Sequence, residues 1–329
     1  MSALEPAAES AAALDALQDA LSDPTVRDLT WLLASSPLLR AFAPVGELAT
    51  VFETRQQSVA AVAWLRELDR DPSALRQAVT ATRIARLGRY AECLLGFFLQ
   101  YGPAARLVAA NVALRLAGRT IGECDFLVES ASGRRLHWEL AVKCYLHAGG
   151  DRAELADYVG PNLQDRFDLK LTHLLGHQLP LSAREEFAAL GHMGPWHPQM
   201  FVKGWLFYRW NDAPPIAQAV DPSHCRGFWA SRAEWPALGA SRAGARWAVL
   251  PRLAWLARRP PVAHEDADAA GLSTADALTE RLAQQTGPIM IAAFERQPPG
   301  LGHWRETDRG FVVPDEWPEQ AWAYARAVV

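Results

Sequence analysis

Charged side chains interrupt two apolar segments in the middle of the chain. In residues 136–146, Glu139 and Lys143 alternate with leucine, tryptophan and valine. Because successive side chains of a strand point to opposite faces, Glu139 and Lys143 share one face and the apolar residues occupy the other. Residues 122–129 repeat the pattern, with Glu123 and Asp125 on one face and Cys124, Phe126 and Val128 on the other. The pattern predicts charged groups on one face of a buried sheet.

A short turn connects these two segments. Residues 130–133 read Ser-Ala-Ser-Gly, which is typical of the turn of a β-hairpin. Such a hairpin would bring Asp125 close to Glu139. Carboxylate oxygens are the ligands that Mg²⁺ prefers, and this ion usually takes one or two protein carboxylates and completes its shell with water and phosphate. The spacing therefore predicts a magnesium site, with Lys143 holding or activating the attacking water.

Composition limits the class of protein. The chain has 329 residues, half of them apolar, which favours a core domain with appended segments. The longest apolar runs are well short of the roughly 20 residues that span a membrane, and residues 1–6 lack the basic and hydrophobic character of a signal peptide. We therefore expect a cytoplasmic protein without membrane contact.

Cysteine spacing and charge exclude some functions and leave others open. The four cysteines form no Cys-x-x-Cys pair, which argues against a zinc knuckle and a disulfide scaffold. The formal net charge of −4 gives no global electrostatic attraction to nucleic acid. Residues 83–119 nevertheless contain six arginines and a single acidic residue, Glu92. These arginines form either a local basic surface or ordinary solvated arginines.

The apolar periodicity predicts an ordered series of helices and strands. Residues 1–80 are expected to be helical, with amphipathic stretches at 12–21, 26–39 and 59–68. A core of order α-β-β-β-α-β follows, with its elements at 84–99, 107–116, 122–129, 136–146, 162–179 and 200–208. The last third is expected to hold strands at 246–257, 288–294 and 310–313 and a helix at 273–284. With a boundary at Pro214 and Pro215, the expected domains are 1–80, 81–215 and 216–329.

This element order, with Glu92 on the first helix, Asp125 on the second strand and Glu139 and Lys143 on the third, resembles the core of the PD-(D/E)XK nucleases over residues 83–210. Over nearly its whole length, the chain also resembles the bacterial family DUF1853. The residues that carry this second resemblance are 26–32 (VRDLTWL), 138–143 (WELAVK), 164–166 (QDR) with Lys170, 177–182 (HQLPLS) and 203–208 (KGWLFY).

The nuclease resemblance implies an α/β fold with a restriction-endonuclease-like core, an N-terminal helical segment and a C-terminal α+β extension. It implies a metal-dependent nuclease in which Asp125 and Glu139, assisted by Glu92, hold Mg²⁺ or Mn²⁺ while Lys143 stabilises negative charge. The residues expected to contact the nucleic acid are Arg89, Arg166, Lys170 and Gln178. The pattern of the superfamily has an acid two residues before the lysine, where this chain has Ala141.

Structural interpretations of the same residues stay open. Lys143 is either catalytic or part of a structural ion pair with a carboxylate of the two strands. Glu92 either helps to hold the metal or pairs with Arg89 on the helix surface. His137, like the other histidines, is interpreted as an ordinary core or polar residue because no partner stands at metal-site spacing. Ala141 also favours an alternative function, a catalytically decayed nuclease-like protein that serves as a nucleic-acid-binding module or a protein scaffold.

Three common enzyme classes are excluded by missing motifs. The chain has no Gly-x-Ser-x-Gly elbow, no Walker A loop and no Gly-x-Gly-x-x-Gly after a predicted strand. We therefore expect neither a serine hydrolase of that type nor a P-loop or dinucleotide-binding enzyme.

Overall fold

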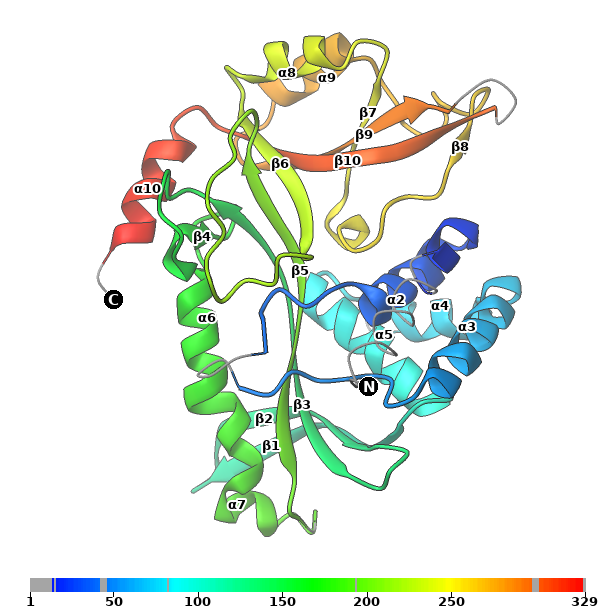
Figure 1. Cartoon of the computed structure of the whole chain (residues 1–329), viewed down its shortest axis with the longest axis vertical. Coiled ribbons are helices and arrows are strands. Elements are labelled where there is room, and N and C mark those ends of the chain that lie inside the picture. The colour runs from blue at the N-terminus through cyan, green and yellow to red at the C-terminus, as the bar shows by residue number, and fades with distance from the viewer. Residues whose placement is uncertain are drawn as a thin grey trace, which may run out of the picture. The chain divides into compact units, whose positions relative to one another are not determined.

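The computed structural model describes Leu14 and residues 16–41, 46–81, 83–192, 194–297 and 302–327. In this part of the chain, helices accompany a mixed sheet of ten strands, so the fold is mixed α/β (Figure 1). The chain divides into two compact units, which comprise Met1–Lys143 with Lys170–Lys203 and Cys144–Leu169 with Gly204–Val329. We call them unit 1 and unit 2. Two long strands each contribute residues to both units. The three segments expected from the sequence stay a prediction.

Helices form the N-terminal part of unit 1. They are α2 (Pro24–Ala34), α3 (Arg55–Arg70), α4 (Ser73–Thr80) and α5 (Leu87–Tyr101). Residues 16–20 are helical as well, whereas 12 and 13, the start of the first predicted stretch, and the N-terminal residues 1–6 lie outside the described residues. The predicted helix 26–39 ends earlier, at Ala34, because Pro37 follows and cannot continue it.

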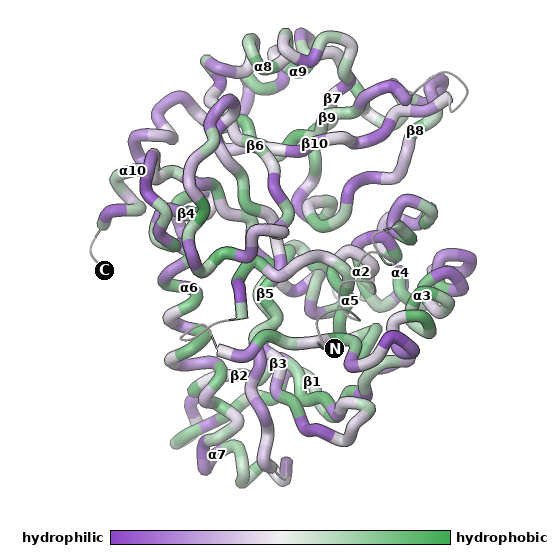
Figure 2. Tube along the Cα trace, in the orientation of Figure 1, coloured by the Kyte–Doolittle hydropathy of each residue, from purple (hydrophilic) through white to green (hydrophobic). Residues whose placement is uncertain are grey.

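Side-chain hydrogen bonds set the ends and the packing of these helices. Asp23 caps α2 by accepting from the backbone N–H groups of Thr25 and Val26. The Tyr90 hydroxyl on α5 donates to Asp28 on α2 over 2.7 Å, and both residues are buried. Helix α3 is amphipathic, and Figure 2 shows hydrophobic and hydrophilic positions alternating around it. Helix α5 packs against α2, α4 and strands β1 and β2.

Long strands form the rest of the frame in unit 1. They are β1 (Arg106–Leu116), β2 (Arg119–Glu129), β3 (Arg135–His147) and β5 (His197–Arg209), in the order β1-β2-β3-β5. The predicted β2–β3 hairpin is confirmed, with Phe126 opposite Trp138 in an antiparallel ladder. Its turn closes with Gly133 at φ +80°, donating to Ser130 over 2.9 Å, a conformation that glycine adopts without a steric cost.

The helix between the third and fourth long strands is irregular. It begins as α6 (Phe167–His173), widens into a π-helical turn η2 (Leu174–Gln178) and tightens into a 3₁₀ segment η3 (Leu179–Ala183). A short helix α7 (Glu185–Ala188) follows. The prediction of a continuous helix over 162–179 is therefore right only in part. A π-helical turn inside a helix is rare and is frequently found at functional sites.

Unit 2 contains the remaining strands and their helices. They are η1 (Leu155–Asp157), β4 (Tyr158–Val159), β6 (Cys225–Ser231), α8 (Trp235–Ser241), β7 (Arg246–Val249), η4 (Arg252–Ala254), β8 (Val262–Ala263), α9 (Ala275–Ala283), β9 (Ile289–Arg296), β10 (His303–Val313) and α10 (Trp317–Arg326). The strand order is β3-β5-β6-β10-β9-β7, with parallel β5–β6 and β6–β10 pairs and antiparallel pairs beyond. An apolar cluster of residues from β6, α8, α9 and β9 forms its core.

The C-terminal predictions are confirmed for β9, β10 and α9, while the predicted strand 246–257 is shorter because Pro251 follows β7. Strand β6 and helices α8 and α10 were not predicted. Both helices begin with a Glu-Trp-Pro sequence, at 234–236 and 316–318, and proline in the first turn is a start signal that the sequence did contain. None of the helices among the described residues combines the length and apolar character of a membrane span.

A buried ion pair lies on strand β10 in unit 2. Arg309 Nε donates to Glu306 Oε1 over 2.6 Å, and both side chains have no exposed surface. The same guanidinium donates to the carbonyl oxygens of Trp255, Leu256 and Ala257. We predict that Arg309→Met lowers the free energy of unfolding by about 3–5 kcal/mol, because it leaves the Glu306 carboxylate buried without its partner. Urea denaturation followed by circular dichroism measures the loss.

Arg106→Met is the matched control, since Arg106 pairs with Glu129 at the surface and should cost less than about 1 kcal/mol. Equal losses for the two variants would contradict the role of Arg309.

Candidate functional site

Two carboxylates meet where strands β2 and β3 separate. The regular β2–β3 pairing ends at Phe126 and Trp138, and the next pair of residues would be Asp125 and Glu139. At this point hydrogen bonds between side chains and the backbone replace the backbone–backbone hydrogen bonds between the strands. The Asp125 backbone N–H donates to Glu139 Oε1 over 3.3 Å, and the Leu140 N–H donates to Asp125 Oδ2 over 2.9 Å. The predicted proximity of Asp125 and Glu139 is therefore confirmed.

The alternation of side chains shifts by one residue at the same place. Cys124 packs in a cluster with Leu127, Leu181 and other apolar side chains, whereas Phe126 lies against Gly96 of α5. The prediction that Cys124 and Phe126 share a face is therefore wrong. Asn111, which lies on β1 between the partners of these two residues, has φ +53°, a conformation that asparagine tolerates and that disturbs the regular pleat.

A chain of hydrogen bonds holds the Glu139 carboxylate in place. His137 Nε2 is hydrogen-bonded to Glu139 Oε1 over 2.7 Å, and His137 Nδ1 to the Ser182 hydroxyl over 3.0 Å. On the other side, Gln178 Nε2 donates to Glu139 Oε2 over 2.6 Å, and Lys170 Nζ donates to Gln178 Oε1 over 2.7 Å. His137 and Glu139 are completely buried. The chain therefore connects a buried carboxylate to an amine on α6.

The surroundings of Asp125 favour its protonated form. Burial raises its pKa to about 8, and the negative charges of Glu139 and Glu92 act in the same direction. The hydrogen bond from Leu140 and the positive charge of Lys170 lower the pKa. Asp125 Oδ1 accepts no hydrogen bond from the described residues. A cation close to this oxygen would relieve the electrostatic cost of the ionised form.

Glu92 contributes charge to the site from α5. It pairs with Arg89 over 2.6 Å, as the structural interpretation expected. Burial raises the pKa of Glu92, the neighbouring Arg89 lowers it, and the charges of Glu123 and Glu139 raise it further. Arg89 also donates to Asn111 over 2.9 Å and lies 3.5 Å from Glu123. Glu92 is thus an electrostatic neighbour of both carboxylates.

The other predicted residues occupy different surroundings. Lys143 is partly buried on β3. Gln178 and Lys170 are engaged in the hydrogen-bond chain to Glu139. Arg166 lies in unit 2, where its buried guanidinium pairs with Asp168 and donates to carbonyl oxygens at the end of α10. These contacts give Arg166 a structural role, because its guanidinium is engaged within the protein.

The donors suit a hard divalent ion in part. Asp125 and Glu139 offer carboxylate oxygens, and two protein carboxylates are enough for Mg²⁺. Glu92 does not complete a tight set, because the group of three possible ligands that converges within 4.8 Å in the described chain is Cys124, His137 and Glu139. Burial and the charges of nearby carboxylates raise the pKa of the Cys124 thiol, which disfavours the thiolate that binds a soft metal. The Asp125–Glu139 pair is the better candidate for a cation.

Sequence reasoning missed two residues of this site. His137 was interpreted as an ordinary histidine, yet it bonds directly to Glu139, two positions along the same strand. Ser182 was not considered individually, and it contacts His137 from η3. His137, Glu139 and Lys143 stand at alternate positions of one strand, and this spacing was a usable signal that His137 lies beside Glu139. No sequence pattern placed Ser182, because its contact depends on how η3 packs against β3.

The raised pKa of Asp125 makes stability depend on pH. The folded protein keeps this proton up to about pH 8, whereas an ordinary aspartate releases it near 3.8, so the folded state binds more protons in between and loses stability as the pH rises. We predict that Asp125→Asn, which keeps an acceptor for Leu140, removes this loss. Relative to wild type, its free energy of unfolding should rise between pH 5 and 9 by at least about 1.4 kcal/mol, which corresponds to one pKa unit.

Urea denaturation at several pH values in the presence of EDTA measures this difference. Glu186→Gln is the control, because its carboxyl has a lowered pKa and titrates below this interval. Parallel pH profiles for wild type and Asp125→Asn would refute the prediction.

Comparison with known proteins gives a family and nothing narrower. Neither a curated protein nor a solved structure matches the chain. A family model described as "Domain of unknown function (DUF1853)" matches residues 27–313 and so includes α5, β1 to β3, α6 and every residue of the site. The sequence resemblance to this family is therefore confirmed, and the chain belongs to DUF1853.

Proposed function

We propose that this protein is a metal-dependent phosphodiesterase that acts on nucleic acid. The observation that supports the proposal best is the buried cross-strand pair of Asp125 and Glu139, which is connected through Gln178 to the amine of Lys170. The order of the larger elements, α5-β1-β2-β3-α6-β5, supports the proposal of a nuclease-like core. The restriction-endonuclease-like assignment of that core is part of the proposal.

Asp125 and Glu139 would hold Mg²⁺ or Mn²⁺. When bound, the ion supplies a Lewis acid for a phosphate oxygen and lowers the pKa of a coordinated water. Asp125 Oδ1 accepts no hydrogen bond within the described part of the chain, and the electrostatic cost of ionising Asp125 beside Glu139 and Glu92 favours a cation there. Glu92 remains outside the ligand set in this proposal and contributes through its charge, because Arg89 occupies one of its oxygens.

The remaining groups orient the carboxylates and balance charge. His137 and Gln178 each bond one oxygen of Glu139, which fixes the plane of this carboxylate. Lys170 provides a positive charge that already lowers the pKa of Asp125, so it is placed to stabilise negative charge that develops on a phosphate. The sequence assigned this role to Lys143. The contacts of Lys170 make it the stronger candidate for stabilising this charge. A catalytic role of Lys143 stays a prediction.

One observation favours the second function, a decayed nuclease-like protein that binds nucleic acid or serves as a scaffold. The residue two positions before Lys143, where the superfamily pattern has an acid, is Ala141, and its side chain is buried. The hydrogen bonds around Glu139 would then be purely structural, since a satisfied buried polar network also specifies a fold. Metal binding separates the two functions.

We predict that wild-type protein binds Mn²⁺ and that Asp125→Asn weakens the affinity by at least about tenfold, because it removes a charged ligand. Isothermal titration calorimetry in metal-free buffer measures both. Glu129→Gln is the matched control, since Glu129 lies on the same strand and pairs with Arg106 at the surface. Absence of Mn²⁺ binding by wild type would favour the scaffold function.

We also predict that Lys170→Met lowers the rate of nucleic-acid cleavage by about 100-fold or more, whereas Lys143→Met lowers it by less than about tenfold. The expected difference follows from the charge that Lys170 exerts on Asp125. Single-turnover cleavage of labelled DNA and RNA strands with Mg²⁺ measures both rates. The reverse order of the two effects would return the catalytic role to Lys143.

A further inference from the structure

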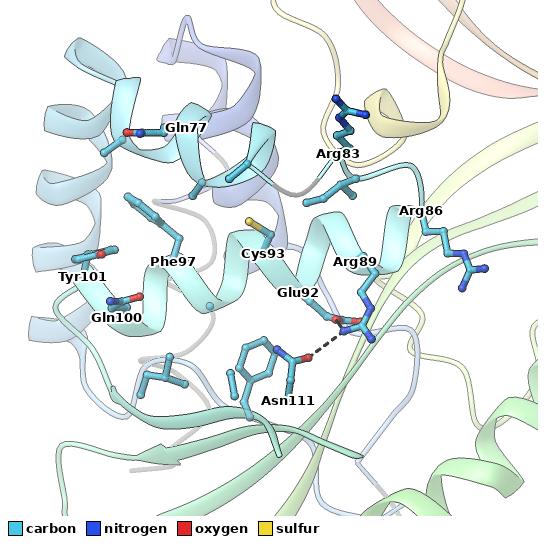
Figure 3. A pocket seen from close by; sticks show the side chains of 18 of the residues that line it. Gln77, Arg83, Arg86, Arg89, Glu92, Cys93, Phe97, Gln100, Tyr101 and Asn111 are labelled. Atoms are coloured by element: carbon cyan, nitrogen blue, oxygen red, sulfur yellow. Dashed lines mark hydrogen bonds and ion pairs between the residues drawn. The ribbon is translucent and has the colours of Figure 1, made fainter. Parts of the chain in front are cut away.

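A large cavity lies in unit 1, and Glu92 is among its lining residues. It has a volume of about 1110 Å³ and is lined by residues of α3, α4, α5, β1 and β2 (Figure 3). This volume is slightly above the usual range of small-molecule sites, about 300–1,000 Å³. Four aromatic side chains contribute to the wall, namely Trp64, Phe97, Tyr101 and Phe126. Tyr101 is 58% exposed, so one aromatic surface is available at the edge of the cavity.

Positive charge gathers at one end of this cavity. Arg83, Arg86 and Arg89 line it near the start of α5, and Figure 3 shows them at the opposite end of the helix from Tyr101. Glu92 is the only acid among its lining residues within the described chain, and Arg89 pairs with it. Arg83 and Arg86 are exposed. The N-terminus of α5 points its free N–H groups to the same end, since Arg86 provides no side-chain cap.

Amide side chains add hydrogen-bonding groups to the wall. Gln77 of α4, Gln100 of α5 and Asn111 of β1 line the cavity, and Figure 3 shows the hydrogen bond between Asn111 and Arg89. An amide offers both a donor and an acceptor. Aromatic faces, amides and a cationic end together match a flat heterocycle that carries a phosphate, because bases stack on aromatic rings and phosphates pair with arginine.

Two residues that line the cavity adjoin the candidate site along the chain and across the sheet. Asn111 lines the cavity from β1, at the position between the partners of Cys124 and Phe126 and so opposite Asp125. Phe126 lines the cavity from the position directly after Asp125 on β2. A strand whose base occupies the cavity would therefore pass its backbone close to the carboxylates.

We infer that this cavity binds the unpaired base of a nucleic-acid strand, with the adjoining phosphates on Arg83 and Arg86. The inference deepens the proposed function and rests on it for the nature of the substrate. It implies single strands, ends or flipped nucleotides as substrates, since a base inside an intact duplex cannot enter a cavity without being extruded. Arg86 and Arg83 replace Arg166 as phosphate contacts.

Binding of matched single strands tests the inference. An eight-nucleotide deoxyadenosine strand is compared by fluorescence anisotropy with a strand of equal length and phosphate number in which every base is absent, in EDTA to prevent cleavage. We predict that wild type binds the base-containing strand at least about fivefold more tightly, as expected for stacking of one or two bases. Equal affinities would overturn the inference, as would failure to bind either strand at low salt.

Two glycines of α5 provide matched variants. Gly96 lines the cavity, and a Cβ added there would meet the Phe126 ring at 3.5 Å, an ordinary contact, so Gly96→Leu fills the cavity. Gly88 lies on the same helix, outside the lining residues, with nothing within 4 Å of an added Cβ. Gly96→Leu should reduce the preference for bases to less than about twofold. Gly88→Leu should keep the wild-type preference.

Ala78→Leu fills the cavity from α4 and guards against a folding defect of Gly96→Leu, and thermal melts check both variants. An unchanged preference for bases in both folded variants would overturn the inference. In the double variant Arg83→Gln and Arg86→Gln, both strands should bind more weakly by the same factor, with a shallower dependence on salt. Binding of an apolar dye that Gly96→Leu abolishes, without any preference for bases, would instead identify a small-molecule site.

The experiments distinguish failure of the proposed function from failure of this inference. A preference for bases without Mn²⁺ binding or cleavage keeps the cavity as a nucleotide site and removes the phosphodiesterase. Cleavage that depends on Asp125, without a preference for bases, keeps the phosphodiesterase and removes the cavity as a nucleotide site.

Discussion

The candidate site depends on two carboxylates that are held together inside the protein. Asp125 and Glu139 occupy opposite positions at the point where β2 and β3 separate, and each bonds a backbone N–H of the other strand. Burial raises the pKa of Asp125 to about 8, and repulsion by the negative charge of Glu139 acts in the same direction. Such an arrangement stores an electrostatic cost, and either a proton or a cation can relieve it. The proposed enzyme uses the cation.

The helix after the third strand supplies the groups that make this arrangement tolerable. Its π-helical turn carries Gln178, whose amide bonds Glu139 with one end and Lys170 with the other. His137 and Ser182 satisfy the opposite side of Glu139. A buried polar network contributes most when all of its members are bonded. The irregular helix is therefore part of the site.

The segments that carry the family resemblance divide into two kinds. Those in residues 138–143 and 177–182 supply Glu139, Gln178 and Ser182. The segment 26–32 has a different role, because Arg27 donates to backbone carbonyls and Asp28 accepts from Tyr90, so its polar residues join α2 to its neighbours. Buried polar side chains with satisfied partners stabilise a unique packing without chemistry. A conspicuous motif in the chain is thus not by itself a site.

Local patterns in the sequence determined the long strands, the hairpin and the helix α5, because these depend on periodicity and turn residues that act over a few positions. They also brought Asp125 and Glu139 together, since the hairpin alone sets that register. Tertiary packing decided the rest. It joined His137 to Ser182, and it connected Lys170 through Gln178 to Glu139. It also placed Arg166 against the end of α10 and formed the cavity that α5 lines together with α3, α4, β1 and β2. Such contacts arise from how elements pack, and no local spacing encodes them.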